Sequence, residues 1–375
     1  MSILTVSKKS LAILLACMLP VSSWSYLSAQ TPNTVATATP NYVQQASLGI
    51  EALQAWYIQN TGLYETTGWW NSANAITVLV NYSRVSGSTQ YRAAIANTFT
   101  AAQTKSKNFL NDYYDDEGWW ALAWIDAYDL TQNPQYLSMA ATIFADMAGG
   151  WDTSTCGGGI WWSKEKHYKN AIANELFFSV AAHLANRAAN FKDRALYLAW
   201  ARKDWKWFTR SGMINAQHLV NDGLDSTNPK ACINNRQNTW SYNQGVILGG
   251  LVELNRAHKD LSLPKIAQAI AAATLANIPD ANGVLREPGG AHGGGDVPQF
   301  KGILLRNLMA LNDAFPNAKF HSFVDINARS IWNYSRDTSY HFGQSWSGPF
   351  DAANAANQSS ALDAIIAAAA MQAPD

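Results

Sequence analysis

Residues 171–184 read AIANELFFSVAAHL, and apolar side chains occupy nearly every position around the helix that this run would form. A helix without a polar face must be covered by protein on all sides. Five further stretches share this character, at residues 74–82, 119–130, 246–254, 302–311 and 361–369. The sequence therefore predicts six helices in the interior of the fold.

Six segments with an apolar stripe at helical spacing alternate with these buried runs. They cover residues 43–59, 91–110, 136–147, 194–209, 263–278 and 320–332. Six buried helices inside six amphipathic ones predict an all-α fold, an (α/α)6 toroid formed by residues 41–375 as a single domain. An open α-solenoid is the alternative, but its inner helices would be less uniformly apolar and its end repeats more polar.

Loops rich in glycine and tryptophan precede several of the buried runs, as in Gly68-Trp69-Trp70 and Gly159-Ile160-Trp161-Trp162. In a toroid, all loops that enter inner helices gather at one end of the ring. We therefore expect the functional site at that end.

The composition is poor in charge and rich in aromatic residues. Charged residues make up 14% of the chain, Lys plus Arg and Asp plus Glu both number 27, and there are 16 Trp. A nucleic-acid-binding protein needs a basic face, which this balance argues against. Abundant aromatic rings, together with many Asn, Gln, Ser and Thr residues, indicate instead an extracellular protein that handles sugars.

The N-terminus has the features of an export signal. Lys8 and Lys9 precede an apolar run at 11–21, and small residues lead to Ala29. Residues 1–29 are therefore predicted to be a signal peptide and residues 30–40 a linker, so the mature protein is expected to be secreted. A lipoprotein-type site at Cys17 is the alternative. The apolar run is too short to cross a bilayer, and no membrane association is expected.

Signal cleavage would leave two cysteines, Cys156 and Cys232. An even number in an exported protein is consistent with one disulfide, and two unrelated thiols are the alternative. Two cysteines cannot supply the four ligands of a structural zinc site, and His292 with Asp296 is a weak ligand pair. We expect neither a metal nor any other cofactor.

Residues 111–120 read NDYYDDEGWW, with four acidic side chains in six positions. Helix capping needs only one carboxylate. Adjacent aspartates beside tryptophan rings should have coupled and perturbed pKa values, as the acid and the nucleophile of a glycosidase require. Asp115 and Asp116 are therefore the candidate catalytic residues, and helix capping is the alternative.

Other aromatic and polar residues near the starts of buried helices are candidates for sugar binding. A flat tryptophan ring can stack on a sugar, although most tryptophans pack in cores or at their rims. The polar groups either cap their helices or point into the mouth of the toroid. These candidates are Trp69, Trp119, Trp120, Asn174, Asp222, Tyr242, Asn243 and Gln244.

The run DDEGWWALAW at residues 115–124 resembles the signature of glycoside hydrolase family 76, the α-1,6-mannanases. The segments 221–224 (NDGL), 240–245 (WSYNQG) and 299–303 (QFKGI) look like later segments of the same family. The resemblance covers essentially the whole mature chain in order. It implies an (α/α)6 fold, no cofactor and retaining endo-hydrolysis of α-1,6-linked mannan.

The resemblance also implies roles for individual residues. Asp115 would be the nucleophile, Asp116 the acid/base, and Lys301 in the QFKGI segment a substrate contact. The expected protein is a secreted endo-α-1,6-mannanase, a monomer whose partner is the mannan polysaccharide. Three alternatives remain: a hydrolase or lyase for another polysaccharide, a transglycosidase of the cell wall, and a non-catalytic mannan-binding protein. A uronate-active enzyme would need Arg and Lys in its cleft.

Overall fold

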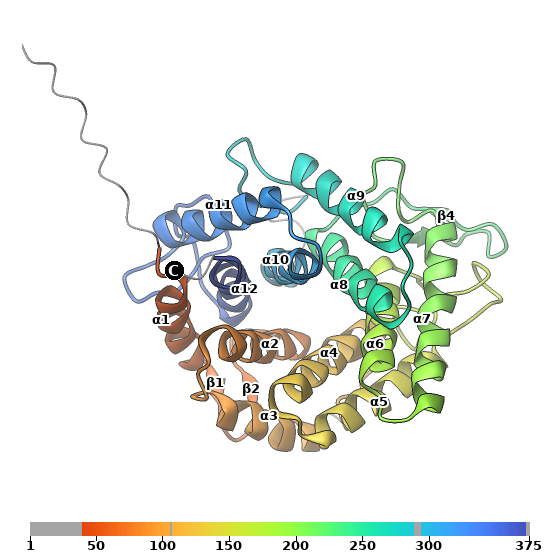
Figure 1. Ribbon diagram of the computed structural model, residues 1–375, viewed down its shortest axis with the longest axis horizontal. Coiled ribbons are helices and arrows are strands. Elements are labelled where there is room, and N and C mark those ends of the chain that lie inside the picture. The colour runs from red at the N-terminus through yellow and green to blue at the C-terminus, as the bar shows by residue number, and fades with distance from the viewer. Residues whose placement is uncertain (1–39, 106, 289–293, 373–375) are drawn as a thin grey trace, which may run out of the picture. The chain divides into compact units, whose positions relative to one another are not determined.

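The computed structural model describes residues 40–105, 107–288 and 294–372. Its helices form two concentric rings, so the predicted (α/α)6 toroid is confirmed (Figure 1). The inner ring consists of α2 (Trp69–Ser86), α4 (Tyr114–Thr131), α6 (Ala171–Arg187), α8 (Ser241–Ala257), α10 (Val297–Ala314) and α12 (Ala355–Met371). The outer ring consists of α1 (Tyr42–Gln54), α3 (Arg92–Lys105), α5 (Pro134–Gly149), α7 (Phe191–Ser211), α9 (Ser262–Asn277) and α11 (Ala318–Tyr334). The predicted signal peptide lies outside the described residues.

The last inner helix closes the ring. Helix α12 packs against α10 on one side and α2 on the other, and it also contacts the first outer helix, α1. Every residue of α12 from Ala355 to Ala368 is buried, as its apolar, alanine-rich sequence predicts. The ring is therefore closed by contacts of the last helix, α12, with the first two helices, α1 and α2.

Three glycines let neighbouring inner helices approach closely near their N-terminal ends. A Cβ at Gly118 of α4 would lie 2.7 Å from Cβ of Leu176 in α6. A Cβ at Gly245 of α8 would lie 2.7 Å from Cα of Leu304 in α10, and one at Gly302 of α10 would meet the main chain of α12 at Ser360. Atoms at such distances overlap, so only glycine fits these contacts.

The structure also moves several predicted boundaries. Inner helices begin up to six residues before the predicted apolar runs, for example at Trp69 rather than residue 74. The first outer helix ends at Gln54 rather than at residue 59, because β1 (Tyr57–Ile58) and β2 (Leu63–Tyr64) form a short antiparallel ribbon there. A second ribbon joins β3 (Leu224–Asp225) to β4 (Ile233–Asn234).

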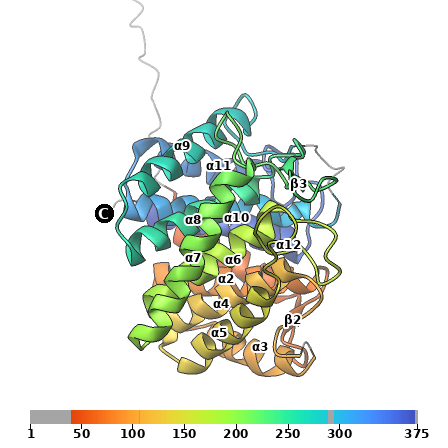
Figure 2. The same cartoon turned by 90° about the vertical axis from the view of Figure 1, so that its right-hand side faces the viewer.

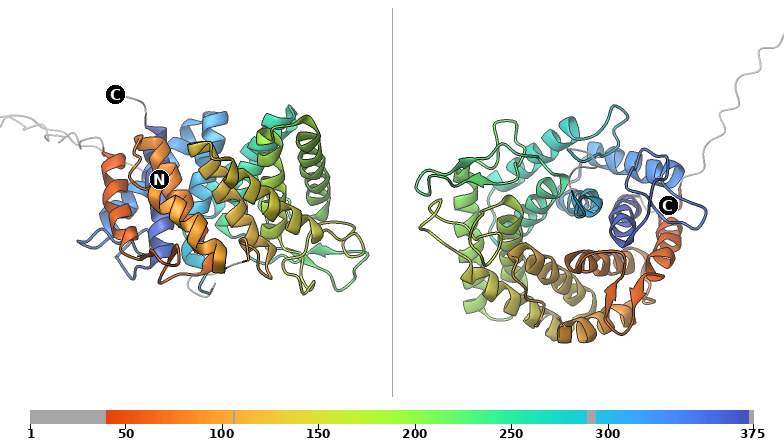
Figure 3. Two further views of the ribbon diagram at one scale, coloured as in Figure 1. Left: turned by 90° about the horizontal axis from the view of Figure 1, so that it is seen from below. Right: turned by 180° about the vertical axis from the view of Figure 1, so that it is seen from behind.

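The long connections all run from an outer helix to the next inner helix, whereas connections from inner to outer helices are short. The side views show the long loops projecting from one end of the ring (Figures 2 and 3). The first turns of the inner helices lie at this end, where the functional site was expected. None of the helices in the described ranges is long and apolar enough to cross a bilayer.

Candidate active site

Asp115 and Asp116 lie in the first turn of α4, which follows the extended residue Tyr113. Backbone N–H groups in a first helical turn lack intrahelical acceptors, and the helix dipole favours negative charge there. Glu117, the third acid in this turn, is fully buried. The two aspartates, in contrast, border a pocket at the mouth of the ring.

The two carboxyl groups differ in their hydrogen bonds. Both oxygens of Asp115 accept one, Oδ2 from Nε1 of Trp162 at 2.9 Å and Oδ1 from the backbone N–H of Asp116 at 3.1 Å. Asp116 accepts a bond at Oδ2, from Nδ2 of Asn111 at 2.6 Å. Within the described ranges, Oδ1 of Asp116 has no hydrogen-bond partner. Donors at both oxygens suit an ionised carboxylate, whereas an oxygen without a donor can carry a proton.

Burial raises the pKa of both carboxyl groups. For Asp115, burial is the largest cause of a raised pKa and the charge of Asp116 adds to it, whereas the hydrogen bonds from Trp162 and from the Asp116 N–H lower the pKa and favour the ionised form. Burial raises the pKa of Asp116 to about 6, opposed by the Asn111 hydrogen bond and assisted by the charge of Asp296. Two close carboxyl groups resist losing both protons, so the pair retains one proton at higher pH than an isolated aspartate. That state supplies one ionised and one protonated group, as a glycosidase requires.

The pocket beside the acid pair has a volume of about 230 Å³ and aromatic walls. Trp70 and Trp119 stack with their ring centroids 5.6 Å apart, and Tyr242 and Phe300 stack at 3.9 Å. None of the described residues that line the pocket is Lys, Arg or His. Apolar rings with a few polar groups form a typical small-molecule site, and the lack of cations suits an uncharged ligand.

The pocket brings together only part of the predicted set. Asp115, Asp116, Trp119 and Tyr242 line it as candidates from the sequence. Five further lining residues were not selected as binding residues from the sequence: Trp70, Tyr113, Trp162, Asp296 and Phe300. Helical geometry could have separated the two tryptophans of each pair, because neighbouring residues in a helix point about 100° apart. Only one member of a Trp pair such as 69–70 or 119–120 can therefore face the pocket.

Three of the predicted binding residues pack away from this pocket. Trp120 is fully buried, with its ring 4.7 Å from that of Phe109, and the ring of Trp69 lies 5.6 Å from that of Trp120. Lys301 is 4% exposed, and its ammonium lies 4.5 Å above the ring of Trp346. These positions give the three side chains packing roles in the wall of the ring.

The predicted polar candidates mainly hold loops. Asn174 accepts the backbone N–H of Ile160 at 2.7 Å, and Gln244 bonds to both the N–H and the carbonyl oxygen of Val220 at 2.8 Å. Asp222 accepts the Tyr168 hydroxyl at 2.5 Å. Asn243 is fully buried. None of these four side chains lines the pocket beside Asp115.

The loop that carries Trp162 is held in a fixed shape. Cys156 in this loop forms a disulfide with Cys232 beside β4, with the two Cα atoms 5.2 Å apart. Lys169 is fully buried and donates from Nζ to three loop carbonyl oxygens, each at 2.7 Å. The Nε1 donor to Asp115 is therefore presented by a loop with little freedom to move.

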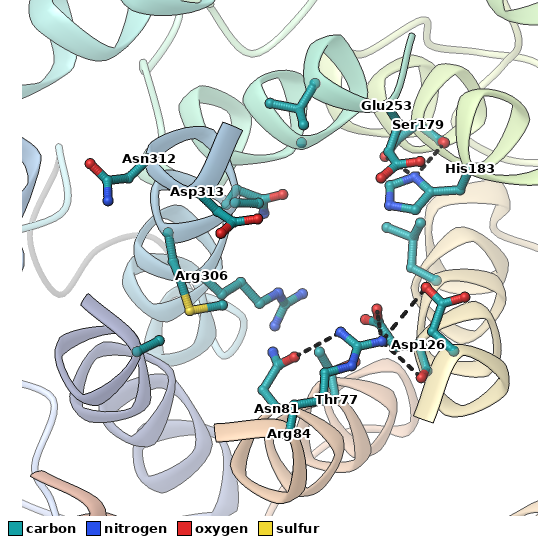
Figure 4. A pocket seen from close by; sticks show the side chains of 18 of the residues that line it. Thr77, Asn81, Arg84, Asp126, Ser179, His183, Glu253, Arg306, Asn312 and Asp313 are labelled. Carbon is teal, nitrogen blue, oxygen red and sulfur yellow. Dashed lines mark hydrogen bonds and ion pairs between the residues drawn. The ribbon is translucent and has the colours of Figure 1, made fainter. Parts of the chain in front are cut away.

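A second pocket, of about 410 Å³, opens at the opposite end of the ring, where the inner helices end. Figure 4 shows Arg84 directed toward Asp126, and Arg306 pointing into the centre. The described residues that line it include no Trp, Tyr or Phe, and arginines pair with several of its acids, as Arg187 does with Asp129 at 2.6 Å. The smaller pocket, with its aromatic walls and a carboxyl oxygen without a donor, is the better candidate for catalysis.

The chain is similar in sequence to proteins named as mannan endo-1,6-alpha-mannosidases. The chain is 29% identical over 205 residues to mannan endo-1,6-alpha-mannosidase DCW1 of Candida albicans, which covers 50% of this chain and 44% of the relative. It is 28% identical over 205 residues to the protein of the same name in Saccharomyces cerevisiae, covering 48% of this chain and 43% of the relative. The chain thus spans about half the length of the curated relatives it matches.

Solved structures that share the fold include the following two. One is an inactive variant of the α-1,6-mannanase GH76A of Salegentibacter sp. HEL1_6, with two adjacent aspartates replaced by asparagine, in complex with α-1,6-mannotriose. It has a TM-score of 0.79 and 24% identity, over 88% of this chain and 99% of that one. The other is Dfg5 from Chaetomium thermophilum with glucosamine, with a TM-score of 0.76 and 22% identity, over 88% and 90%.

The sequence model of glycosyl hydrolase family 76 matches residues 29–375. This match covers most of the chain and includes the α4 segment with both aspartates. The chain belongs to glycosyl hydrolase family 76.

Proposed function

We propose that this protein is an exported endo-α-1,6-mannanase that hydrolyses the backbone of α-1,6-linked mannan with retention of configuration. The unequal hydrogen bonding of Asp115 and Asp116 is the observation that carries the proposal. Family membership and the names of the relatives support the substrate. The Salegentibacter enzyme is inactive when two adjacent aspartates are replaced, and Asp115 and Asp116 are such an adjacent pair.

In the first step, a carboxylate oxygen of Asp115 forms a bond to the anomeric carbon as the glycosidic C–O bond breaks. The electron pair of that bond stays on the departing oxygen, which takes the proton from Asp116. Donors at both oxygens of Asp115 favour its ionised form, and the oxygen of Asp116 without a donor provides the proton. The aromatic walls would hold the sugar against the acid pair.

In the second step, a water oxygen attacks the same carbon from the side that the leaving group vacated. Asp116, now ionised, accepts a proton from this water, and the ester bond to Asp115 breaks. Two inversions at one carbon give net retention. Both residues return to their starting protonation states.

Two substitutions test these roles on unbranched α-1,6-mannan and on an aryl mannoside with a good leaving group. Asp115→Ala should abolish turnover of both substrates, because no glycosyl-enzyme can form. Asp116→Ala should lose most activity on mannan but retain more on the aryl mannoside, whose leaving group needs little protonation. Circular dichroism would check that both variants are folded. Near-native activity of both variants on mannan, or a first product with inverted configuration by NMR, would contradict the proposal.

A transglycosidase is the second candidate, because a glycosyl-enzyme on Asp115 suits either reaction. The same glycosyl-enzyme would then be attacked by a sugar hydroxyl in place of water. Incubation with mannan fragments should yield shorter products from a hydrolase and additional longer ones from a transglycosidase. A binding protein would release no reducing sugar at all.

A further inference from the structure

Asn111 precedes α4 and bonds to the residues on either side of the helix start. Its Oδ1 accepts the backbone N–H of Tyr113 at 2.8 Å, and its Nδ2 donates to Oδ2 of Asp116 at 2.6 Å. A backbone N–H can only donate, so the amide oxygen must face Tyr113 and the amide NH₂ must face Asp116. The chain itself therefore fixes which way this side chain is turned.

This orientation bears on where Asp116 carries its proton. Oδ2 faces a hydrogen of the Asn111 amide, and a second hydrogen on Oδ2 along the same line would collide with it. Oδ1 belongs to a side chain that borders the pocket, and it has no donor among the described residues. We propose that Asn111 is a positioning residue that keeps the exchangeable proton of Asp116 on Oδ1.

The inference rests on the proposed function, because it concerns the proton that Asp116 transfers. In the first step Oδ1 would donate this proton to the departing glycosidic oxygen. In the second step the same oxygen would accept a proton from the attacking water. Throughout, the Asn111 amide would donate to Oδ2, so the carboxyl group would not need to turn between steps.

The buried carboxyl group of Glu117, paired with the partly exposed Lys164, holds Asn111 in place. Oε1 of Glu117 accepts both the backbone N–H of Asn111 at 3.1 Å and a bond from Nζ of Lys164 at 3.0 Å. Lys164 also pairs with Asp146 at 2.9 Å, and its backbone N–H donates to the carbonyl oxygen of Asp112 at 2.9 Å. Glu117 is fully buried, whereas the side chain of Lys164 is 34% exposed, so solvent reaches the pair from one side only. Residues 111 and 112 are thus anchored on two sides.

The charges around Asp116 show what the amide contributes. Asp115 in the same turn and Asp296 at the start of α10 are acidic neighbours, and negative charge favours the protonated form of Asp116. The Asn111 hydrogen bond acts in the opposite direction and favours the ionised form. Loss of this bond should therefore make Asp116 harder to deprotonate. It should also allow the proton to occupy either of the two carboxyl oxygens.

The experiment measures kcat and kcat/KM on unbranched α-1,6-mannan across pH for Asn111→Ala, Glu117→Ala and Glu117→Gln. Asn312→Ala is the matched control at the other end of the ring. Its Oδ1 accepts the backbone N–H of Asn317 at 2.9 Å and its Nδ2 lies 3.1 Å from Nε2 of His321, so the substitution removes the same kinds of contact. Melting temperatures of all variants separate loss of folding from loss of positioning.

We expect Asn111→Ala to move the alkaline limb of kcat/KM upward by about one pH unit, the size of one hydrogen bond to a charged group. Its kcat on mannan should fall by roughly ten- to a hundredfold, as for impaired general acid–base catalysis. Glu117→Ala should change the profile in the same direction. Glu117→Gln retains an acceptor for the Asn111 N–H and should change it less. Asn312→Ala should leave the profile unchanged.

Failure of the proposed function and failure of the positioning role of Asn111 give different results. If the wild type releases no sugar from mannan, or Asp116→Ala keeps near-native activity, the proposed function itself is wrong. If those tests succeed but the alkaline limb of Asn111→Ala stays at the wild-type pH, only the positioning role is overturned.

Discussion

At the scale of single residues, the ionisation of Asp115 depends on two N–H donors, and one of them comes from a distant loop. Trp162→Phe would remove the Nε1 donor to Oδ2 of Asp115 and leave an aromatic ring in place. The pKa of Asp115, already raised by burial, should rise further. We expect the acid limb of kcat/KM to shift to higher pH, and kcat/KM at its optimum to fall roughly ten- to a hundredfold.

Trp207→Phe is the control for this substitution. It removes an Nε1 hydrogen bond to the carbonyl oxygen of Cys156 in the same loop, at 2.9 Å, but Trp207 does not line the pocket. This control should lower the melting temperature without moving the acid limb. An equal shift of the limb in both variants would mean that loop disorder, and not the donor to Asp115, sets the ionisation.

Ionisation of Asp116 should also lower the stability of the fold above about pH 6. Its pKa is raised from the usual value near 4 to about 6, chiefly by burial, so the folded state holds the proton more tightly than the unfolded chain. Stability should therefore fall as pH rises from about 4 to about 6 and stay lower above that range. Asp116→Asn cannot ionise and should have a higher melting temperature than the wild type at about pH 8. A difference that is the same at pH 4 and pH 8 would contradict this account.

The sequence predicted the reacting residues better than the binding residues. Asp115 and Asp116 stand out because only 14% of the residues in this chain are charged, so adjacent acids indicate a specific role. Asn174, Gln244 and Lys301 carry polar groups that look equally suited to a sugar, but the structure directs them to loop main chain or to an aromatic ring. Which way a side chain points depends on tertiary contacts, which the residue type does not encode.

At the scale of helices, the buried runs predicted the inner ring but not where its helices begin. The first turns, such as Trp69-Trp70-Asn71 in α2 and Ser241-Tyr242-Asn243 in α8, carry polar and aromatic residues at the mouth and so break the apolar pattern. The functional end of each inner helix was therefore the part hardest to assign. The segment predicted to continue to residue 59 turned into the β1–β2 ribbon, because apolar and aromatic residues suit either structure over so short a run.

The glycines within the family-like segments have a packing role that can be measured. Gly302→Ala would place a methyl group against the main chain of α12 at Ser360, where there is no flexible side chain to give way. We expect a loss of about 1–3 kcal/mol in the free energy of unfolding by urea, the usual cost of overpacking. Gly149→Ala at the end of α5 is the control, because a Cβ there would meet nothing within 4 Å. Equal stability of the two variants would show that α10 and α12 can separate without cost.

At the scale of the whole molecule, ion pairs link the inner helices, some at the end opposite the acid pair and some midway along the ring. Arg187 of α6 donates to both oxygens of Asp129 in α4, at 2.6–2.9 Å, and to Glu253 in α8 at 2.8 Å. Arg306 of α10 pairs with Asp363 in α12 at 2.9 Å and donates to Asn74 in α2 at 2.5 Å. These charged residues join helices that are distant in sequence, and the carboxylate of Asp363 is fully buried within the ring.

Arg187 offers a test of this linkage that spares the reaction. Arg187→Met keeps an unbranched side chain but removes the cation that Asp129 and Glu253 share, which leaves Glu253 with Arg256 and Asp129 with Arg84. Breaking a buried ion pair by removing one partner typically costs about 3–5 kcal/mol. The triple variant Arg187→Met, Asp129→Asn, Glu253→Gln removes both carboxylate charges as well and should recover most of that loss. Activity at neutral pH should remain, because Arg187 lies at the opposite end from Asp115 and Asp116.

The pH dependence of stability separates the charge of Arg187 from its packing. Burial alone would raise the pKa of Glu253, but the positive charges of His183, Arg187 and Arg256 lower it from 4.5 to about 2. A carboxyl group with a lowered folded pKa contributes stability above its unfolded pKa, and that stability is lost as pH falls through the folded value. The wild type should therefore lose stability between about pH 4 and pH 2. In Arg187→Met, protonation would instead relieve the repulsion between Asp129 and Glu253, so its deficit relative to the wild type should shrink as pH falls. A deficit that stays constant over this range, measured by urea unfolding, would show that Arg187 acts through packing and not through its charge.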